Sequence, residues 1–194
     1  MATGDLKSNA ALGFLTVVEH PKYGLFGGYL VLNAAGQPLE FHCTAPIKPN
    51  RAQQILYGPT LESFLYGDQI GHTLLQKAVI DPLVICTDQE PALSVRQRVS
   101  LPVVLVLSRQ DPAQPDADGR LRRFDGAHAT GIQESSPGLI AFQLGANRLA
   151  VPQRTRDDRA LITERLAELS ESFDLVEPFG RIREAIEEAQ QAVR

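Results

Sequence analysis

The stretch PLVICTD, Pro82 to Asp88, is an apolar run that ends on a carboxylate. Its β-branched and apolar residues predict a strand, and the alternation of side chains along a strand places Cys86 and Asp88 on the same face. An acid at this position has two interpretations. Either Asp88 caps the helix that follows, or it is a metal ligand at the point where a strand of the sheet ends.

Further strands are predicted on both sides of this stretch. Upstream, GFLTVVEH (13–20), YLVLN (29–33) and PLEFHCT (38–44) are rich in β-branched and aromatic residues. The short turns between them predict an antiparallel meander. Downstream, LPVVLVLS (101–108) is almost wholly apolar, which is typical of a strand covered on both faces of a sheet.

Helical patterns lie between these strands. RAQQILY (51–57) follows Asn50, which is a good N-cap, and Thr60 precedes a second helix with apolar residues at helical spacing. EPALSVRQRVS (90–100) predicts a short helix. The order over residues 1–108 is therefore β-β-β-α-β-α-β. The predicted fold class is α+β or α/β, with a mixed five-stranded sheet and flanking helices.

A change of composition divides the chain after the fifth predicted strand. RQDPAQPDADGR (109–120) contains Asp, Pro and Gly in the pattern of a linker loop. Residues 121–194 predict a β-hairpin and two helices that pack on the first domain, the first helix being capped by Thr155. The last helix carries one apolar stripe, formed by Val176, Phe179, Ile182 and Ile186. This stripe either covers the sheet core or binds a protein partner or a second copy.

Composition restricts the class of protein. The net charge is −4 and the pI about 5.6, which gives no overall attraction to nucleic acid or anionic lipid. Cys43 and Cys86 lie in apolar runs and are expected to be buried, reduced thiols. The N-terminus does not resemble a signal peptide, and no apolar run approaches the roughly 20 residues that span a bilayer. We therefore expect a soluble, cytoplasmic protein without membrane contact.

Three short motifs resemble the ribonuclease H-like superfamily. They are GGYLVL (27–32), NRAQ (50–53) and ICTDQ (85–89), which are similar in order to the second strand, first helix and fourth strand of that family. The predicted element order of the first half of the chain is similar too. The resemblance implies metal-assisted hydrolysis of a phosphodiester, in which carboxylates from strand one, helix one and the end of strand four hold two Mg²⁺ or Mn²⁺ ions.

The resemblance carries over to only some of these positions. Asp88 matches the aspartate of strand four, and Glu19 lies near the end of strand one, where the family has Asp. Gln53 stands where the family has the helix Glu, so Asp68 or Glu62 on the following helix would have to replace it. The resemblance thus implies Glu19, Asp68 and Asp88 as catalytic residues, with Glu19 and Asp88 as metal ligands.

Two functions follow as expectations. One carboxylate is missing and another is altered, so we expect a catalytically degenerate domain that acts as a binding or scaffold subunit. The alternative is a divalent-metal-dependent nuclease. Four arginines are candidates for contacts with a phosphate backbone, or they belong to a solvated loop and helix face: Arg96, Arg98, Arg122 and Arg123.

Overall fold

The structure is a computed structural model that describes residues 10–107, 120–121 and 138–191. The strands of this part of the chain are β1 (Ala11–His20), β2 (Gly24–Asn33), β3 (Pro38–Cys43), β4 (Ile85–Thr87), β5 (Val103–Leu107), β6 (Arg120–Leu121), β7 (Leu139–Leu144) and β8 (Asn147–Pro152). The helices are α1 (Arg51–Tyr57), η1 (Gly58–Thr60), α2 (Leu61–Ser63), η2 (Phe64–Gly71), α3 (His72–Lys77), η3 (Glu90–Gln97), η4 (Gln153–Thr155), α4 (Asp158–Leu166) and α5 (Glu177–Gln191).

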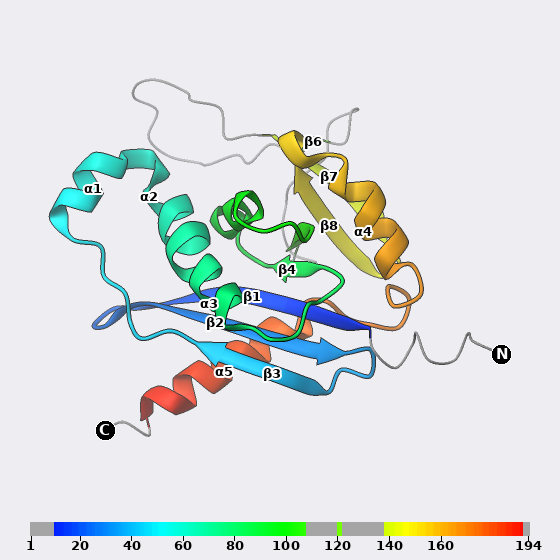
Figure 1. Cartoon of the computed structure of the whole chain (residues 1–194), viewed down its shortest axis with the longest axis horizontal. Coiled ribbons are helices and arrows are strands. Elements are labelled where there is room, and N and C mark those ends of the chain that lie inside the picture. Colours follow the sequence, from blue (N-terminus) through cyan, green and yellow to red (C-terminus); the bar gives the residue numbers. More distant parts are fainter. Residues whose placement is uncertain (1–9, 108–119, 122–137, 192–194) are drawn as a thin grey trace.

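The described strands form one mixed sheet in the order β3-β2-β1-β4-β5-β8-β7-β6 (Figure 1). β1, β2 and β3 are an antiparallel meander, and β4 and β5 add to β1 in parallel. The α+β class and the mixed sheet are therefore confirmed. The sequence predicted a sheet that ends at β5, but the sheet continues beyond this strand. β8 pairs antiparallel with β5, so the C-terminal hairpin extends the same sheet.

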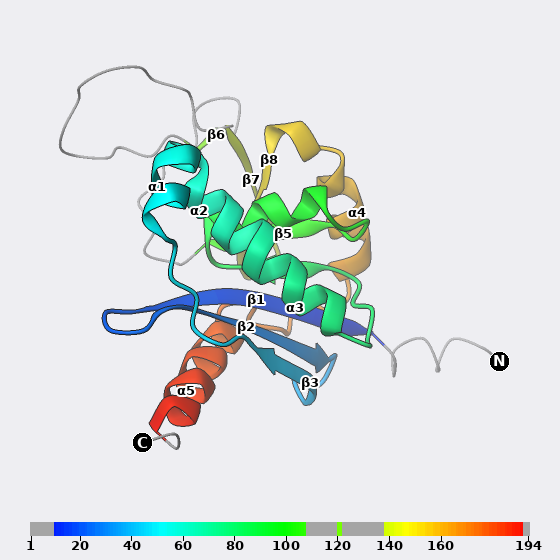
Figure 2. The ribbon, with the colours of Figure 1, turned by 60° about the vertical axis from the view of Figure 1, so that its left-hand side comes forward.

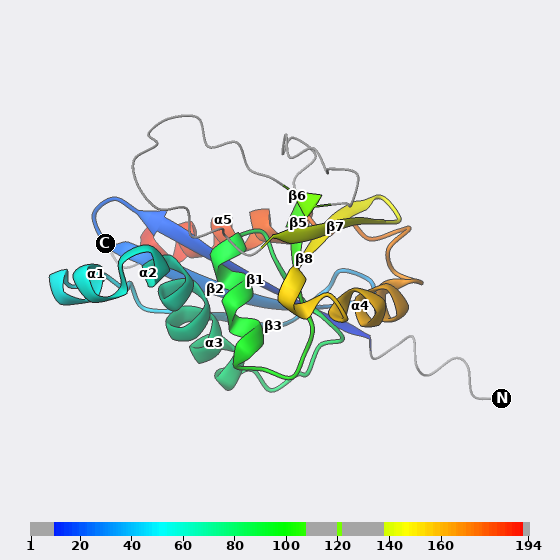
Figure 3. The same ribbon diagram turned by 90° about the horizontal axis from the view of Figure 1, so that it is seen from above.

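Helices cover both faces of the meander (Figure 2). The continuous helical run of α2, η2 and α3 lies on one face, together with η3, and α5 lies on the other. The apolar stripe of α5 is buried, with Phe179, Ile182 and Ile186 at most 2% exposed, whereas Val176 is 39% exposed. The stripe therefore covers the sheet core, and it is not a free surface for a partner. Seen from above, α4 lies beside the β7–β8 hairpin (Figure 3).

Two neighbouring glycines in β2 bring these layers close to the sheet. A Cβ at Gly27 would collide with Ile70 of η2 on one face, and a Cβ at Gly28 would collide with Ile182 of α5 on the other. Successive residues of a strand point to opposite faces, so each glycine serves a different helix. Because these two glycines of the GGY motif have no side chains, η2 and α5 pack directly against the backbone of β2. This fixes the position of α5 over β1 and β2.

Some local predictions are wrong in detail. α4 begins at Asp158, and the Thr155 hydroxyl donates a hydrogen bond to the Pro152 carbonyl, in the turn before that helix. Cys43 is exposed because it lies on the edge strand β3, whereas Cys86 is buried as expected. Burial raises the pKa of the Cys86 thiol to about 12.

The predicted linker (109–120) lies outside the described residues except for Arg120, which belongs to β6. Within the described residues, no helix combines the length and the apolar character that crossing a membrane requires.

Candidate functional site

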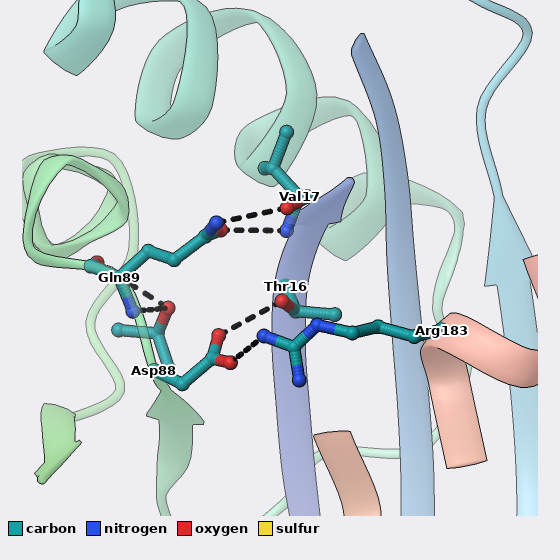
Figure 4. Close-up of polar contacts among 6 residues, drawn as sticks. Thr16, Val17, Asp88, Gln89 and Arg183 are labelled. Atoms are coloured by element: carbon teal, nitrogen blue, oxygen red, sulfur yellow. Dashed lines mark hydrogen bonds and ion pairs between the residues drawn. The ribbon is translucent and has the colours of Figure 1, made fainter. Parts of the chain in front are cut away.

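Asp88 lies directly after β4, at the point where this strand runs beside β1. Leu15 pairs with Thr87 in the parallel register, so Thr16 and Asp88 are the next residues along the two strands. The buried Thr16 hydroxyl donates a hydrogen bond of 2.8 Å to Oδ1 of Asp88. This contact orients the Asp88 carboxylate toward the α5 face of the sheet (Figure 4).

Arg183 of α5 binds the second oxygen of the same carboxylate. Its Nη2 forms an ion pair with Oδ2 of Asp88, and Figure 4 shows the guanidinium approaching from the helix. The Asp88 side chain is 17% exposed and that of Arg183 is 42% exposed, so the pair lies at the edge of the core. We call Thr16, Asp88 and Arg183 the Asp88 cluster. It joins β1, β4 and α5 through one carboxylate.

Gln89 makes a second link between the end of β4 and β1. The Val17 N–H donates to Oε1 of Gln89 at 2.7 Å, and Nε2 of Gln89 donates to the Val17 carbonyl at 2.8 Å. The side-chain amide thus satisfies a backbone donor and a backbone acceptor, as another strand residue would. Gln89 also occupies the N-cap position of η3, where no side chain caps the helix. Asp88 is therefore not a helix cap, and that interpretation of the sequence is wrong.

The other acids predicted for the site lie elsewhere. Glu19 is exposed near the end of β1, and it shares the face of Val17 because side chains alternate, whereas Thr16 faces α5. Asp68 belongs to η2, in the helical layer that covers the Val17 face of the sheet, and it pairs with Arg98 at 2.9 Å. The structure does not bring Glu19 or Asp68 to Asp88. Among the described residues, no group of three or more His, Cys, Asp or Glu side chains is arranged to hold a metal ion.

The remaining candidates for the missing carboxylate have other surroundings. Gln53 and Asn50 form a capping box at α1, in which each side chain accepts from the backbone N–H of the other. Glu62 is exposed at the start of α2 and acts electrostatically on Tyr66. Burial raises the pKa of Tyr66, and the charges of Glu62 and Glu19 raise it further. Glu19 and Glu62 therefore lie near Tyr66 of η2 and not near Asp88.

Two of the arginines predicted to contact nucleic acid are engaged inside the molecule. Arg96 binds both oxygens of Asp158, at 2.7 and 3.1 Å, and donates to the Val99 carbonyl. The hydrogen bond to Asp158 raises the pKa of Arg96, although partial burial opposes this. Arg98 is held by Asp68. Arg122 and Arg123 lie outside the described residues, so a nucleic-acid contact of this region stays a prediction.

Sequence reasoning missed Thr16 and Arg183. Thr16 carries a weak signal, because it is a polar residue on the buried stretch of β1 between Leu15 and Val17. Arg183 carries none, since its contact with Asp88 spans 95 residues of sequence. No protein-family profile matches the chain, and a search of curated proteins finds no match either.

Proposed function

We propose that this chain is a ribonuclease H-like domain whose carboxylate site is degenerate and which acts as a binding or scaffold subunit. The order β3-β2-β1-β4-β5, with an antiparallel meander and two parallel additions, supports the resemblance that the motifs carry. Fold alone does not give function, so the residues around Asp88 decide between the two candidate functions.

The observation that carries this proposal is the occupation of Asp88 by the chain itself. The resemblance implies a carboxylate from strand one beside Asp88, and the neighbour in β1 is the neutral hydroxyl of Thr16. A metal-binding site would present further oxygen ligands to a cation, and here the cation is the guanidinium of Arg183. The residues around Asp88 do not fit Mg²⁺ or Mn²⁺, because a second positive charge would be repelled there.

A cleavage assay separates this proposal from the nuclease alternative. The full chain is incubated with Mg²⁺ or Mn²⁺ and single-stranded, duplex or hybrid substrates, and no metal-dependent cleavage is expected. Cleavage that disappears in Asp88→Asn and persists in Asp68→Asn would establish the nuclease and overturn the proposal. Asp68 is a suitable control because its carboxylate pairs with Arg98 on the other helical layer.

A metal-binding measurement tests the same proposal from the opposite direction. The double variant Thr16→Asp, Arg183→Ala adds a carboxylate beside Asp88 and removes the competing cation. Titration calorimetry with Mn²⁺ is expected to show binding to this variant and none to the parent chain. If the parent binds Mn²⁺ and Asp88→Asn abolishes that binding, then Arg183 does not replace a metal.

The binding or scaffold role has its own readout. Because the stripe of α5 is buried, self-association through this helix is not expected. A mass that stays monomeric over a wide concentration range excludes a second copy as the partner, while a concentration-dependent mass points to one. A scaffold role predicts that such binding persists in Asp88→Asn, because the carboxylate joins elements inside the molecule.

A further inference from the structure

A cleft of about 360 Å³ lies on the opposite side of the sheet from the Asp88 cluster, near the start of β4 and β5. Its lining changes with depth. The outer residues Asp81, Arg98 and Ser100 are exposed and polar, while the inner residues Tyr29, Pro82 and Ile85 are buried. The wall between them is made of half-buried apolar side chains: Leu75, Ala78, Ile80, Val99 and Leu101.

The floor of this cleft contains a buried polar atom without a partner. Tyr29 is fully buried, and its hydroxyl makes no hydrogen bond within the described part of the chain. A buried hydroxyl without a partner costs roughly 1–3 kcal/mol, so native proteins seldom leave one unpaired. The Tyr29 hydroxyl therefore lacks an acceptor, which an oxygen atom of a ligand in the cleft would supply.

The hydroxyl of Tyr29 lies beside Gly13 of β1. A Cβ at Gly13 would meet the Tyr29 ring at 3.0 Å and collide with its hydroxyl, so only glycine leaves room there. Gly13 pairs with Ile85 across β1 and β4, and Ile85 lines the cleft. The chain thus makes room for a hydroxyl in a place where a phenylalanine would fill the core equally well.

Nearby charges restrict what this hydroxyl can bind. Burial raises the pKa of Tyr29, and the negative charges of Glu40 and Asp81 raise it further. The hydroxyl therefore stays protonated and acts as a donor, with the negative charges of Glu40 and Asp81 in its surroundings. An anionic ligand would be repelled, whereas a neutral oxygen acceptor would not. Arg98 at the rim does not reverse this preference, since its charge is paired with Asp68.

We propose that this cleft binds a compact, neutral, mainly apolar molecule whose carbonyl or ether oxygen accepts the hydrogen bond of Tyr29. Such a ligand would place its apolar body against the wall residues and its acceptor at the floor. This combination of apolar walls with one or two placed polar groups is typical of small-molecule sites. The site is independent of the Asp88 cluster, and its occupation does not depend on the proposed degenerate site.

The test uses two probes of the same shape and different charge, cyclohexanecarboxamide and cyclohexanecarboxylate. Methyl NMR titration of the full chain is expected to show saturable shifts at Leu75, Ile85 and Leu101 with the amide. The carboxylate should bind at least several-fold more weakly. Absence of saturable shifts at these methyl groups with either probe would overturn the proposal, and so would tighter binding of the carboxylate.

Two variants connect the binding to the hydroxyl and to the cleft. Tyr29→Phe should weaken amide binding by roughly three- to tenfold, which corresponds to one hydrogen bond, and should leave the fold intact because no protein partner is lost. Tyr66→Phe is the matched control. Ala78→Trp should fill the cleft and abolish binding, whereas Ala52→Trp on the exposed α1 should not. Unchanged binding in both Tyr29→Phe and Ala78→Trp would place the probe elsewhere and refute the site.

Discussion

At the scale of single residues, Asp88 holds three elements together through two contacts of different kinds. Thr16 supplies a neutral hydrogen bond from within the sheet, and Arg183 supplies a charge from α5. The arginine is the more exposed of the partners, so water screens its charge. Removal of this cation leaves a partly buried carboxylate with only the threonine.

Arg183→Met is expected to lower the free energy of unfolding by about 1 kcal/mol, because Asp88 loses its cation but stays partly hydrated. Urea denaturation measures the loss, and a double-mutant cycle with Asp88→Asn isolates the coupling between the two side chains. Arg156→Met is the control, since this side chain is 73% exposed beside a fully solvated Asp157. A coupling energy indistinguishable from zero would contradict the role given to the pair.

A second carboxylate, Glu40, gives the molecule a dependence on pH. It accepts from the backbone N–H groups of Val79 and Ile80 and lies 2.5 Å from Nε2 of His42. Burial raises the pKa of Glu40, but the hydrogen bonds with His42, Val79 and Ile80 outweigh burial and leave the pKa below its ordinary value of 4.5. The ionised form is therefore the one that stabilises the fold.

Because the folded-state pKa of Glu40 is lowered, its contribution is present above about pH 4.5 and is lost as the pH falls through the folded value. Glu40→Gln should therefore be less stable than the parent at pH 7, and the difference should shrink below pH 4.5. Denaturant unfolding at pH 7 and pH 3 measures both gaps. Glu187→Gln on the exposed side of α5 should show little change, and an equal gap at both pH values for Glu40→Gln would refute the assignment.

At the scale of elements, the π-helical η2 and the 3₁₀-helical η3 approach each other through a glycine. A Cβ at Gly67 would collide with the Ser94 hydroxyl and lie 2.7 Å from the backbone nitrogen of Val95. The backbone of η3 cannot yield as a flexible side chain would. The close approach of η2 to η3 therefore depends on the absence of a side chain at this position.

Gly67→Ala should destabilise the fold by about 1–3 kcal/mol, because the added methyl group forces η2 and η3 apart. Gly180→Ala is the matched substitution. Gly180 lies in α5 with no atom within 4 Å of its Cβ position, so alanine there should stabilise by about 0.4–1 kcal/mol. Thermal and urea unfolding measure both changes. Equal effects of the two substitutions would show that helix propensity, and not the close approach, decides the result.

The buried stripe of α5 leads to a prediction about stability. Ile182→Ala removes a fully buried side chain from the layer over β1 and β2 and should cost about 2–5 kcal/mol of unfolding free energy. The mass in solution should not change. Leu161→Ala, at a position that is 42% exposed on α4, should cost far less. A change of mass without a loss of stability would show that the stripe binds a partner and does not cover the core.

At the scale of the whole molecule, the sequence predicted most of the strands because their signal is local. β1, β3 and β5 were placed within two residues of their bounds, whereas β2 begins at Gly24, five residues before its predicted start, in a stretch that was predicted as a turn. The continuation of the sheet past β5 was not predicted. β5 and β8 pair across more than 40 residues, and no local pattern states which strands become neighbours.

The candidate site was less predictable than the fold for the same reason. Asp88 stands out because it ends an apolar run, but its partners come from β1 and from α5, which lies far away in sequence. Glu19 does not lie beside Asp88, because the alternation of side chains along β1 turns it toward the helical layer that contains Tyr66. Side-chain periodicity along β1 could have shown that Glu19 and Thr16 point to opposite faces.

The amide of Gln89 has a consequence for the chemical ageing of the protein. Its nitrogen donates to the Val17 carbonyl and its oxygen accepts from the Val17 N–H, so both halves of the amide are needed. Hydrolysis of this amide to a carboxylate would put an oxygen in place of the nitrogen that donates to the Val17 carbonyl, and would so replace one hydrogen bond between the end of β4 and β1 with a repulsion. Deamidation of the half-buried Gln89 would therefore leave one added negative charge at the junction of β1 and β4, as a permanent chemical mark of the protein's age.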